Sequence, residues 1–101
     1  MREDLAERHF AEIEAELMRE RAAALRRACG KLEERLEDCR ALAAQIDSAP
    51  ESSVRREQAR RRYNEACRAA EDARWEFYVV REAMGLLDHT WVDRIYPRPQ
   101  R

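Results

Sequence analysis

The chain has 101 residues, of which 41% are charged and 45% are apolar, and its formal net charge is −1 at neutral pH. This length fits a single domain, and a net charge near zero creates no overall field that would attract nucleic acid or a membrane surface. Only two glycines and three prolines interrupt a chain rich in alanine, glutamate, arginine and leucine. Such a composition is typical of long helices, so we predict an all-α protein.

The three cysteines, Cys29, Cys39 and Cys67, form no CxxC pair. The sequence also shows no signal peptide and no apolar run of about 18 residues. These features predict a cytoplasmic protein without a membrane segment. We interpret the cysteines as small buried apolar side chains rather than as redox or metal-binding groups.

The first predicted helix covers about residues 2–47. Its acidic start suits the positive end of a helix dipole. Between Leu25 and Ile46 apolar residues alternate three and four apart, which is a heptad seam. Upstream, Phe10, Ile13 and Leu17 follow a neighbouring track, which indicates a stutter or a widened apolar face.

A turn is predicted at about residues 48–52, around Pro50. Ser48 and Glu51 fit a capping box, so the second helix begins at about Ala49 or at Ser53 and runs to about residue 84. A second heptad seam predicts this helix over five heptads. The seam residues are Ala59, Tyr63, Ala66, Ala70, Ala73, Phe77, Val80, Met84 and Leu87.

Gly85 is predicted to end the second helix in a left-handed cap, with Leu86 as the apolar residue that follows it. Asp88 would then cap a short third helix over about residues 88–95, and the tail 97–101 is expected to fray. The alternative is one unbroken helix to residue 95. Either way, residues 1–101 form one helical domain, a long antiparallel coiled-coil-like hairpin.

In this hairpin, the residue numbers of facing residues should sum to roughly 99. Val80 would then face Met18, and Ala70 would face Gly30. A close approach of the two backbones would explain Gly30, and a hinge is the alternative. Two helices without a third layer leave apolar surface in water, so we expect a homodimer that forms a four-helix bundle.

A second apolar stripe beside the main seam of the second helix is the candidate interaction surface. Either the C-terminal tail or a second chain would cover it. Its members, with one aromatic residue of the tail, are Trp75, Tyr78, Val79, Leu86 and Trp91. Charge supports association, because residues 1–20 carry −4 and residues 48–68 carry +3.

Two other groups of residues could carry chemistry. A basic stretch at the start of the second helix could bind nucleic acid or another polyanion, although pairs such as Glu57 and Arg61 also fit a solvated, salt-bridged surface. The stretch contains Arg55, Arg56, Arg60, Arg61 and Arg62. His9 and His89 would meet at the open end of the hairpin, where a metal site is conceivable, although surface or interface positions explain them as well.

No phosphate-binding loop, nucleophile elbow or catalytic triad pattern is present, so we expect neither catalysis nor a cofactor. Helical hairpins of this size occur among secretion-apparatus escort proteins, small chaperones and uncharacterised bacterial proteins, a resemblance of architecture alone. The sequence therefore predicts a non-catalytic interaction, scaffold or small chaperone-like protein. The alternatives are polyanion binding through the arginine stretch and a small metal-binding bundle.

Overall fold

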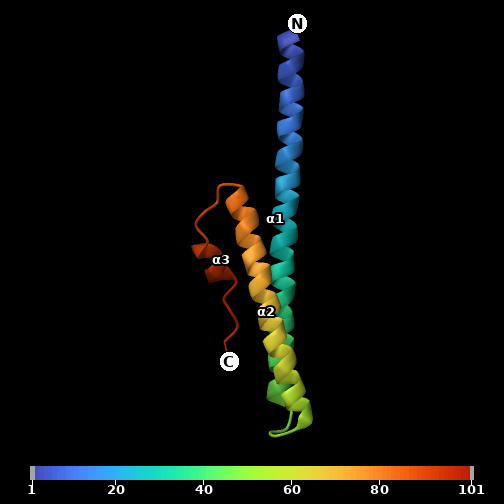
Figure 1. Cartoon of the computed structure of the whole chain (residues 1–101), viewed down its shortest axis with the longest axis vertical. Helices are drawn as coiled ribbons and strands as arrows, with labels where there is room; N and C mark the ends of the chain where they lie inside the picture. The colour runs from blue at the N-terminus through green and yellow to red at the C-terminus, as the bar shows by residue number, and fades with distance from the viewer. Residues whose placement is uncertain (1, 101) are drawn as a thin grey trace.

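A computed structural model describes residues 2–100, with side chains from residue 4 onward. Over these residues the chain forms three helices and no strand: α1 (Arg2–Ser48), α2 (Val54–Ala83) and α3 (Thr90–Ile95). α1 and α2 run antiparallel and pack against each other in a rod of 78 × 22 × 15 Å (Figure 1). The predicted all-α architecture with two long packed helices is confirmed.

The turn between α1 and α2 differs in detail from the expected capping box. α1 continues through Ser48, because Ala49 N still donates to Gln45 O at 3.1 Å. The cap of α2 is Ser53, whose hydroxyl accepts from Arg56 N at 3.1 Å. Ser48 is therefore not a helix start, since its backbone is still hydrogen-bonded within the preceding helix.

α2 ends in a left-handed glycine cap. Gly85 has φ +83°, Leu86 N donates to Arg81 O at 2.9 Å, and Gly85 N donates to Glu82 O at 2.9 Å. These two bonds are the Schellman pattern, which stops a helix by satisfying its last carbonyls. The chain thus does not continue as one helix to residue 95.

The core follows the two heptad seams, with one residue from α3. Large side chains such as Leu32, Leu36 and Phe77 are almost completely buried against small ones such as Ala70 and Ala73. The buried cluster consists of Ala28, Leu32, Leu36, Cys39, Ile46, Ala59, Tyr63, Ala70, Ala73, Phe77 and Val92. Burial of this seam is what holds the two helices together.

The register of the hairpin differs from the expected one by about one heptad. Lys31 Nζ lies 3.1 Å from Glu76 Oε2, and Cys39 lies against Cys67, so the numbers of facing residues sum to 107 and 106. Val80 lies beside the turn of Ala28, and not beside the exposed Met18 as expected. A slip of seven residues keeps both seams face to face, so the seams alone do not select the register.

Gly30 has no close neighbour in this register. A methyl group added at Gly30 would meet no atom within 4 Å. The expected close approach of the two backbones at Gly30 is therefore wrong, because the register brings other residues opposite it.

α1 extends well beyond α2 at the open end of the hairpin (Figure 1). α1 has 47 residues and α2 has 30. From residue 4 to residue 21 every side chain is exposed. We call residues 2–21 the overhang. At 1.5 Å per residue, the overhang is a single helix of about 30 Å without a partner in the chain.

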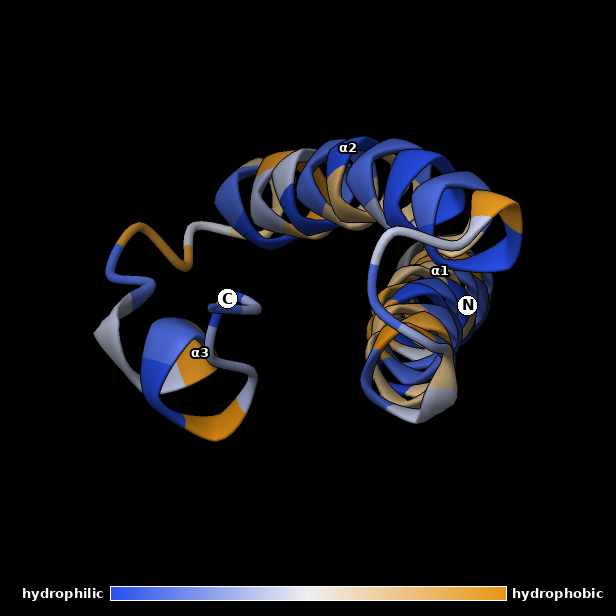
Figure 2. Cartoon of the chain, turned by 90° about the horizontal axis from the view of Figure 1, so that it is seen from below, coloured by the Kyte–Doolittle hydropathy of each residue, from blue (hydrophilic) through white to orange (hydrophobic). Residues whose placement is uncertain are grey.

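The C-terminal residues 86–100, which we call the strap, fold back along α2. They place α3 beside α2, and the segment after α3 runs through the space between α3 and α1 (Figure 2), where the Tyr96 hydroxyl lies 3.2 Å from Cys29 Sγ of α1. Val92 of α3 is fully buried. Arg98, near the end of the strap, is bonded to Glu71 at 2.9 Å; the fraying expected for residues 97–101 stays a prediction, and residue 101 lies outside the described residues.

Candidate protein-interaction surface

A buried arginine of α2 binds the middle of the strap. Arg74 is only 1% exposed. Its Nη1 donates to Asp93 Oδ1 at 3.1 Å, and its Nη2 donates to Tyr96 O at 2.5 Å. A buried guanidinium is tolerated only when an opposite charge and hydrogen bonds satisfy it, so these bonds fix the position of α3.

A second buried arginine, Arg81, binds the start of the strap. Its Nη2 donates to Asp88 O at 2.8 Å, and its Nε donates to His89 Nδ1 at 3.2 Å. Its guanidinium carbon lies 5.9 Å from the ring centre of Phe77 and 5.0 Å from that of Trp91. Arg81 is thus held between two aromatic rings by cation–π attraction.

Tyr78 contacts both the start and the middle of the strap. Its ring stacks on His89 with centroids 4.2 Å apart, and its hydroxyl donates to Asp93. That hydrogen bond holds the pKa of Asp93 below its ordinary value. Burial, together with the bond to Asp93, raises the pKa of Tyr78. Tyr78 is therefore part of an internal contact.

The five residues of the candidate interaction surface do not form one patch. Tyr78 and Trp91 take part in the contact between α2 and the strap, and Leu86 begins the strap. Trp75 and Val79 instead line a hollow between α1 and α2. The tail therefore folds back, but it leaves Trp75 68% exposed.

The hollow beside Trp75 has a volume of about 420 Å³. Its lining is Ala24, Arg27, Ala28, Lys31, Trp75, Glu76, Val79 and Val80. Small alanines and Val80 provide an apolar floor, and Trp75 stands exposed at its edge. Two cations line the hollow. Lys31 is paired with Glu76, whereas Arg27 forms no salt bridge with a carboxylate of the hollow.

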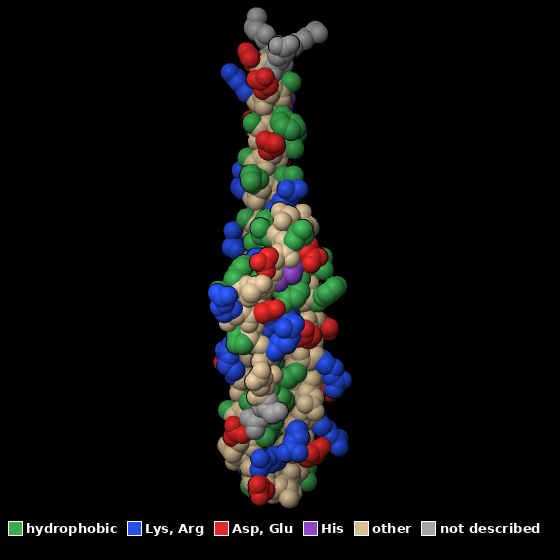
Figure 3. Space-filling model, turned by 90° about the vertical axis from the view of Figure 1, so that its left-hand side faces the viewer, with side chains coloured by type: hydrophobic (Ala, Val, Ile, Leu, Met, Phe, Trp, Pro, Cys, Tyr) green, Lys and Arg blue, Asp and Glu red, His purple; other side chains and the backbone are tan. Residues whose placement is uncertain are grey.

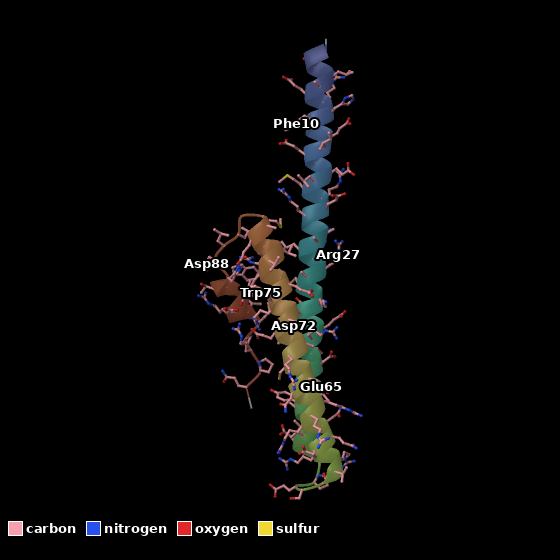
Figure 4. All side chains as sticks on the ribbon, in the orientation of Figure 1. Phe10, Arg27, Glu65, Asp72, Trp75 and Asp88 are labelled. Atoms are coloured by element: carbon pink, nitrogen blue, oxygen red, sulfur yellow. The ribbon has the colours of Figure 1, made fainter. Side chains whose placement is uncertain are left out.

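The overhang carries a second exposed apolar surface. In the sequence, its residues formed an apolar track beside the seam of the first helix. Phe10 and Ile13 are each 63% exposed, and Leu17 is 42% exposed. Figure 4 shows Phe10 on the part of α1 that rises beyond α2. Phe10 lies about five helical turns before the buried Ala28, so it projects on the side of α1 where α2 packs. Figure 3 shows hydrophobic side chains along this column.

The arginine stretch surrounds the start of α2. Arg60, Arg61 and Arg62 are consecutive, so they project about 100° apart around the helix and share no single face. Arg61 pairs with Glu57 at 3.4 Å. Arg56 and Arg60 line a polar hollow that also contains Glu51 and Glu57, so its charge is mixed.

The two histidines are not brought together. His89 lies in the strap beside Tyr78, whereas His9 lies on the overhang, more than ten residues beyond the end of α2. Among the described residues, no group of three or more His, Cys, Asp or Glu side chains has a spacing suited to a metal ion. The expected meeting of His9 and His89 is therefore wrong.

The cysteines are all free thiols. Burial, and next the neighbouring Cys67, raises the pKa of Cys39 to about 11. Cys29 Sγ lies 3.2 Å from the Tyr96 hydroxyl, where it helps to hold the end of the strap against α1. A thiol with a raised pKa is a poor nucleophile at neutral pH, which agrees with a packing role for Cys39.

The chain matches no protein-family model, no curated protein sequence and no solved structure. Over the part that the structure describes, none of the helices is apolar for long enough to cross a lipid bilayer. Functional inference therefore depends on the surfaces described above.

Proposed function

We propose that this is a non-catalytic interaction or scaffold protein that binds an amphipathic helix of another protein in the hollow beside Trp75. The carrying observation is that Trp75 stays 68% exposed next to an apolar floor even though the strap is fully docked. Exposed tryptophans beside pockets are frequent anchors in protein interfaces.

The chemistry of the hollow indicates the kind of helix it would accept. Ala24 and Ala28 let a helix approach closely, and Val79 and Trp75 would contact its apolar side chains. Arg27 at the edge favours a carboxylate on the incoming helix. We therefore expect a partner helix with an apolar face and an acidic flank.

Photo-crosslinking in the source organism tests this proposal. A photoreactive residue at position 79 should form a covalent adduct with another protein, whereas the same residue at the exposed Arg26, which projects from α1 away from the hollow, should not. An added Ala24→Glu substitution, which places a charge in the hollow at a residue outside the buried cluster, should abolish the adduct at position 79 while thermal unfolding shows that the hairpin stays folded. Equal adducts at both positions, or none at position 79, would contradict the proposal.

Other expectations from the sequence are not supported by a specific observation. Polyanion binding is not favoured, because Arg60, Arg61 and Arg62 project in different directions. The hollow that Arg56 and Arg60 line also contains the carboxylates of Glu51 and Glu57. The homodimeric four-helix bundle and the cytoplasmic location stay predictions.

A further inference from the structure

We infer that the overhang pairs in antiparallel fashion with the overhang of a second copy of this chain. This pairing uses a surface separate from the hollow beside Trp75. It would join two hairpins end to end through a two-helix junction rather than side by side in a four-helix bundle. The following observations carry it.

The apolar stripe of the overhang reads the same in both directions. It consists of Ala6, Phe10, Ile13 and Leu17, spaced four, three and four residues apart. In an antiparallel copy, each residue of the stripe therefore lies at the same height as one residue of the other stripe. Phe10 lies beside Ile13 of the second copy, and Leu17 lies beside its Ala6. Pairing of large with small residues at the ends is what interdigitated packing requires.

The pairing also continues the arrangement inside the hairpin. In the observed register, Ala83 at the end of α2 is level with about residue 24 of α1. When two overhangs overlap completely, residue 2 of one copy stands beside residue 21 of the other. A second antiparallel helix would thus begin on α1 almost where α2 stops, so α1 would be covered along its whole length.

The overhang lacks the packing that normally stabilises a helix. Most helical stability in proteins comes from packing of an apolar face, whereas the side chains of residues 4–21 are all exposed. Phe10, Ile13 and Leu17 would be buried by the pairing in both copies at once.

The basic turn end of a second hairpin is the other part of a second copy that could bind the overhang, and it fits less well. Its charge complements the acidic overhang, but the exposed side chains from Arg55 to Arg68 are polar or charged. At this end Val54 is an exposed apolar side chain, but its exposed neighbours from Arg55 onward are polar or charged, so they do not extend it into a ridge that could match Phe10 and Ile13. The apolar match therefore favours overhang on overhang.

The charges next to the stripe make the proposal testable. In this register, Glu14 of each copy lies across the interface from Glu7 of the other copy. The two-fold symmetry of the dimer produces this pair twice. Like charges at this distance weaken the pair. The proposed dimer should therefore tighten as salt screens these carboxylates, whereas pairing with a basic surface should weaken.

Sedimentation equilibrium of the full chain measures the dimer constant in four variants. Glu14→Lys or Glu7→Lys replaces both repulsive pairs by attractive ones, so each should tighten the dimer roughly tenfold. The double variant restores like charges and should return towards the wild-type constant. Glu12→Lys changes the net charge equally but lies off the stripe, so it should fall well short of the tightening caused by Glu14→Lys.

Ile13→Asp should abolish the dimer while leaving the hairpin folded, because the overhang contributes nothing to the α1–α2 core; thermal unfolding checks the fold. A monomeric wild type, a dimer that survives Ile13→Asp, or a dimer weakened by Glu14→Lys would overturn the inference. None of these results affects crosslinking from position 79, so failure here is distinct from failure of the proposed function.

Discussion

The two glycines of the chain occupy opposite backbone environments. Gly30 lies within α1 with ordinary helical geometry and open space around it, whereas Gly85 has φ +83° at the end of α2. Glycine lowers helix stability where another residue would fit, and it is needed where a left-handed conformation is required. The same substitution should therefore have opposite effects at the two positions.

We expect Gly30→Ala to stabilise the protein by about 0.5–1 kcal/mol, because alanine reduces the entropy of the unfolded chain and favours helix. Gly85→Ala should destabilise it by about 1 kcal/mol, because alanine disfavours positive φ. Urea unfolding of both variants measures the difference. Destabilisation by Gly30→Ala would contradict the open space around Gly30, because it would require a closer approach of the α1 and α2 backbones there.

At the scale of the elements, the two boundaries of α2 are decided by the groups that satisfy its free backbone N–H and C=O groups, a side chain at the start and the backbone at the end. Ser53 caps α2 through Arg56 N, and the Schellman bonds of Gly85 and Leu86 end it. Ser48 lies only five residues before Ser53, yet its hydroxyl merely donates to Gln45 O at 3.2 Å. Two serines in similar sequence contexts thus have different structural roles.

Replacing these two serines by alanine tests which of them is the cap. Ser53→Ala should cost about 1 kcal/mol, since an amide at the start of α2 loses its acceptor. Ser48→Ala should change stability by less than about 0.5 kcal/mol, because alanine suits the last turn of a helix. Chemical denaturation gives both values, and a larger loss for Ser48→Ala would place the helix start at the capping box expected from the sequence.

For the whole molecule, the strap is the part whose position depends on buried charge. Arg74 is almost completely buried, and its carboxylate partner Asp93 is 45% exposed. The strap also buries its own Val92 and packs Tyr96 against the core, so its docking combines apolar contacts with polar ones. Release of the strap would take away Asp93, the nearer of two carboxylates beside Arg74, and leave only Glu71 of α2, 3.9 Å away.

Acid should therefore loosen the strap. The Tyr78 hydroxyl lowers the pKa of Asp93 below 3.8 in the folded chain. A lowered pKa means that the carboxylate stabilises the docked strap above about pH 4, and that this contribution is lost as pH falls through the folded value. Trp91 fluorescence in a Trp75→Phe background should report the change.

Asp93→Asn is the matching substitution. It should cost about 1–2 kcal/mol, less than for a fully buried pair because Asp93 is partly exposed, and should remove most of the acid dependence. Asp72→Asn makes the same chemical change at an exposed position of α2 and is the control. Equal acid sensitivity in both variants would mean that another carboxylate holds the strap.

The sequence by itself determined the helices and where they break, because these depend on residues near each other in the chain. Heptad seams specify the buried faces, Gly85 specifies the left-handed cap, and Pro50 marks the turn. The exposed stripe of Phe10, Ile13 and Leu17 was also visible in the sequence, but without the register it could not be recognised as an overhang.

Only the tertiary structure decided the register, the overhang and the docking of the strap. A seven-residue slip leaves the same seams facing each other, so the choice depends on small differences summed over distant pairs such as Lys31 and Glu76. Likewise, Arg74 and Arg81 have the pattern of solvated surface residues until the strap, whose bonded residues lie 7 to 22 residues away along the chain, folds over them. Their burial is a property of that long-range contact, which no local sequence pattern encodes.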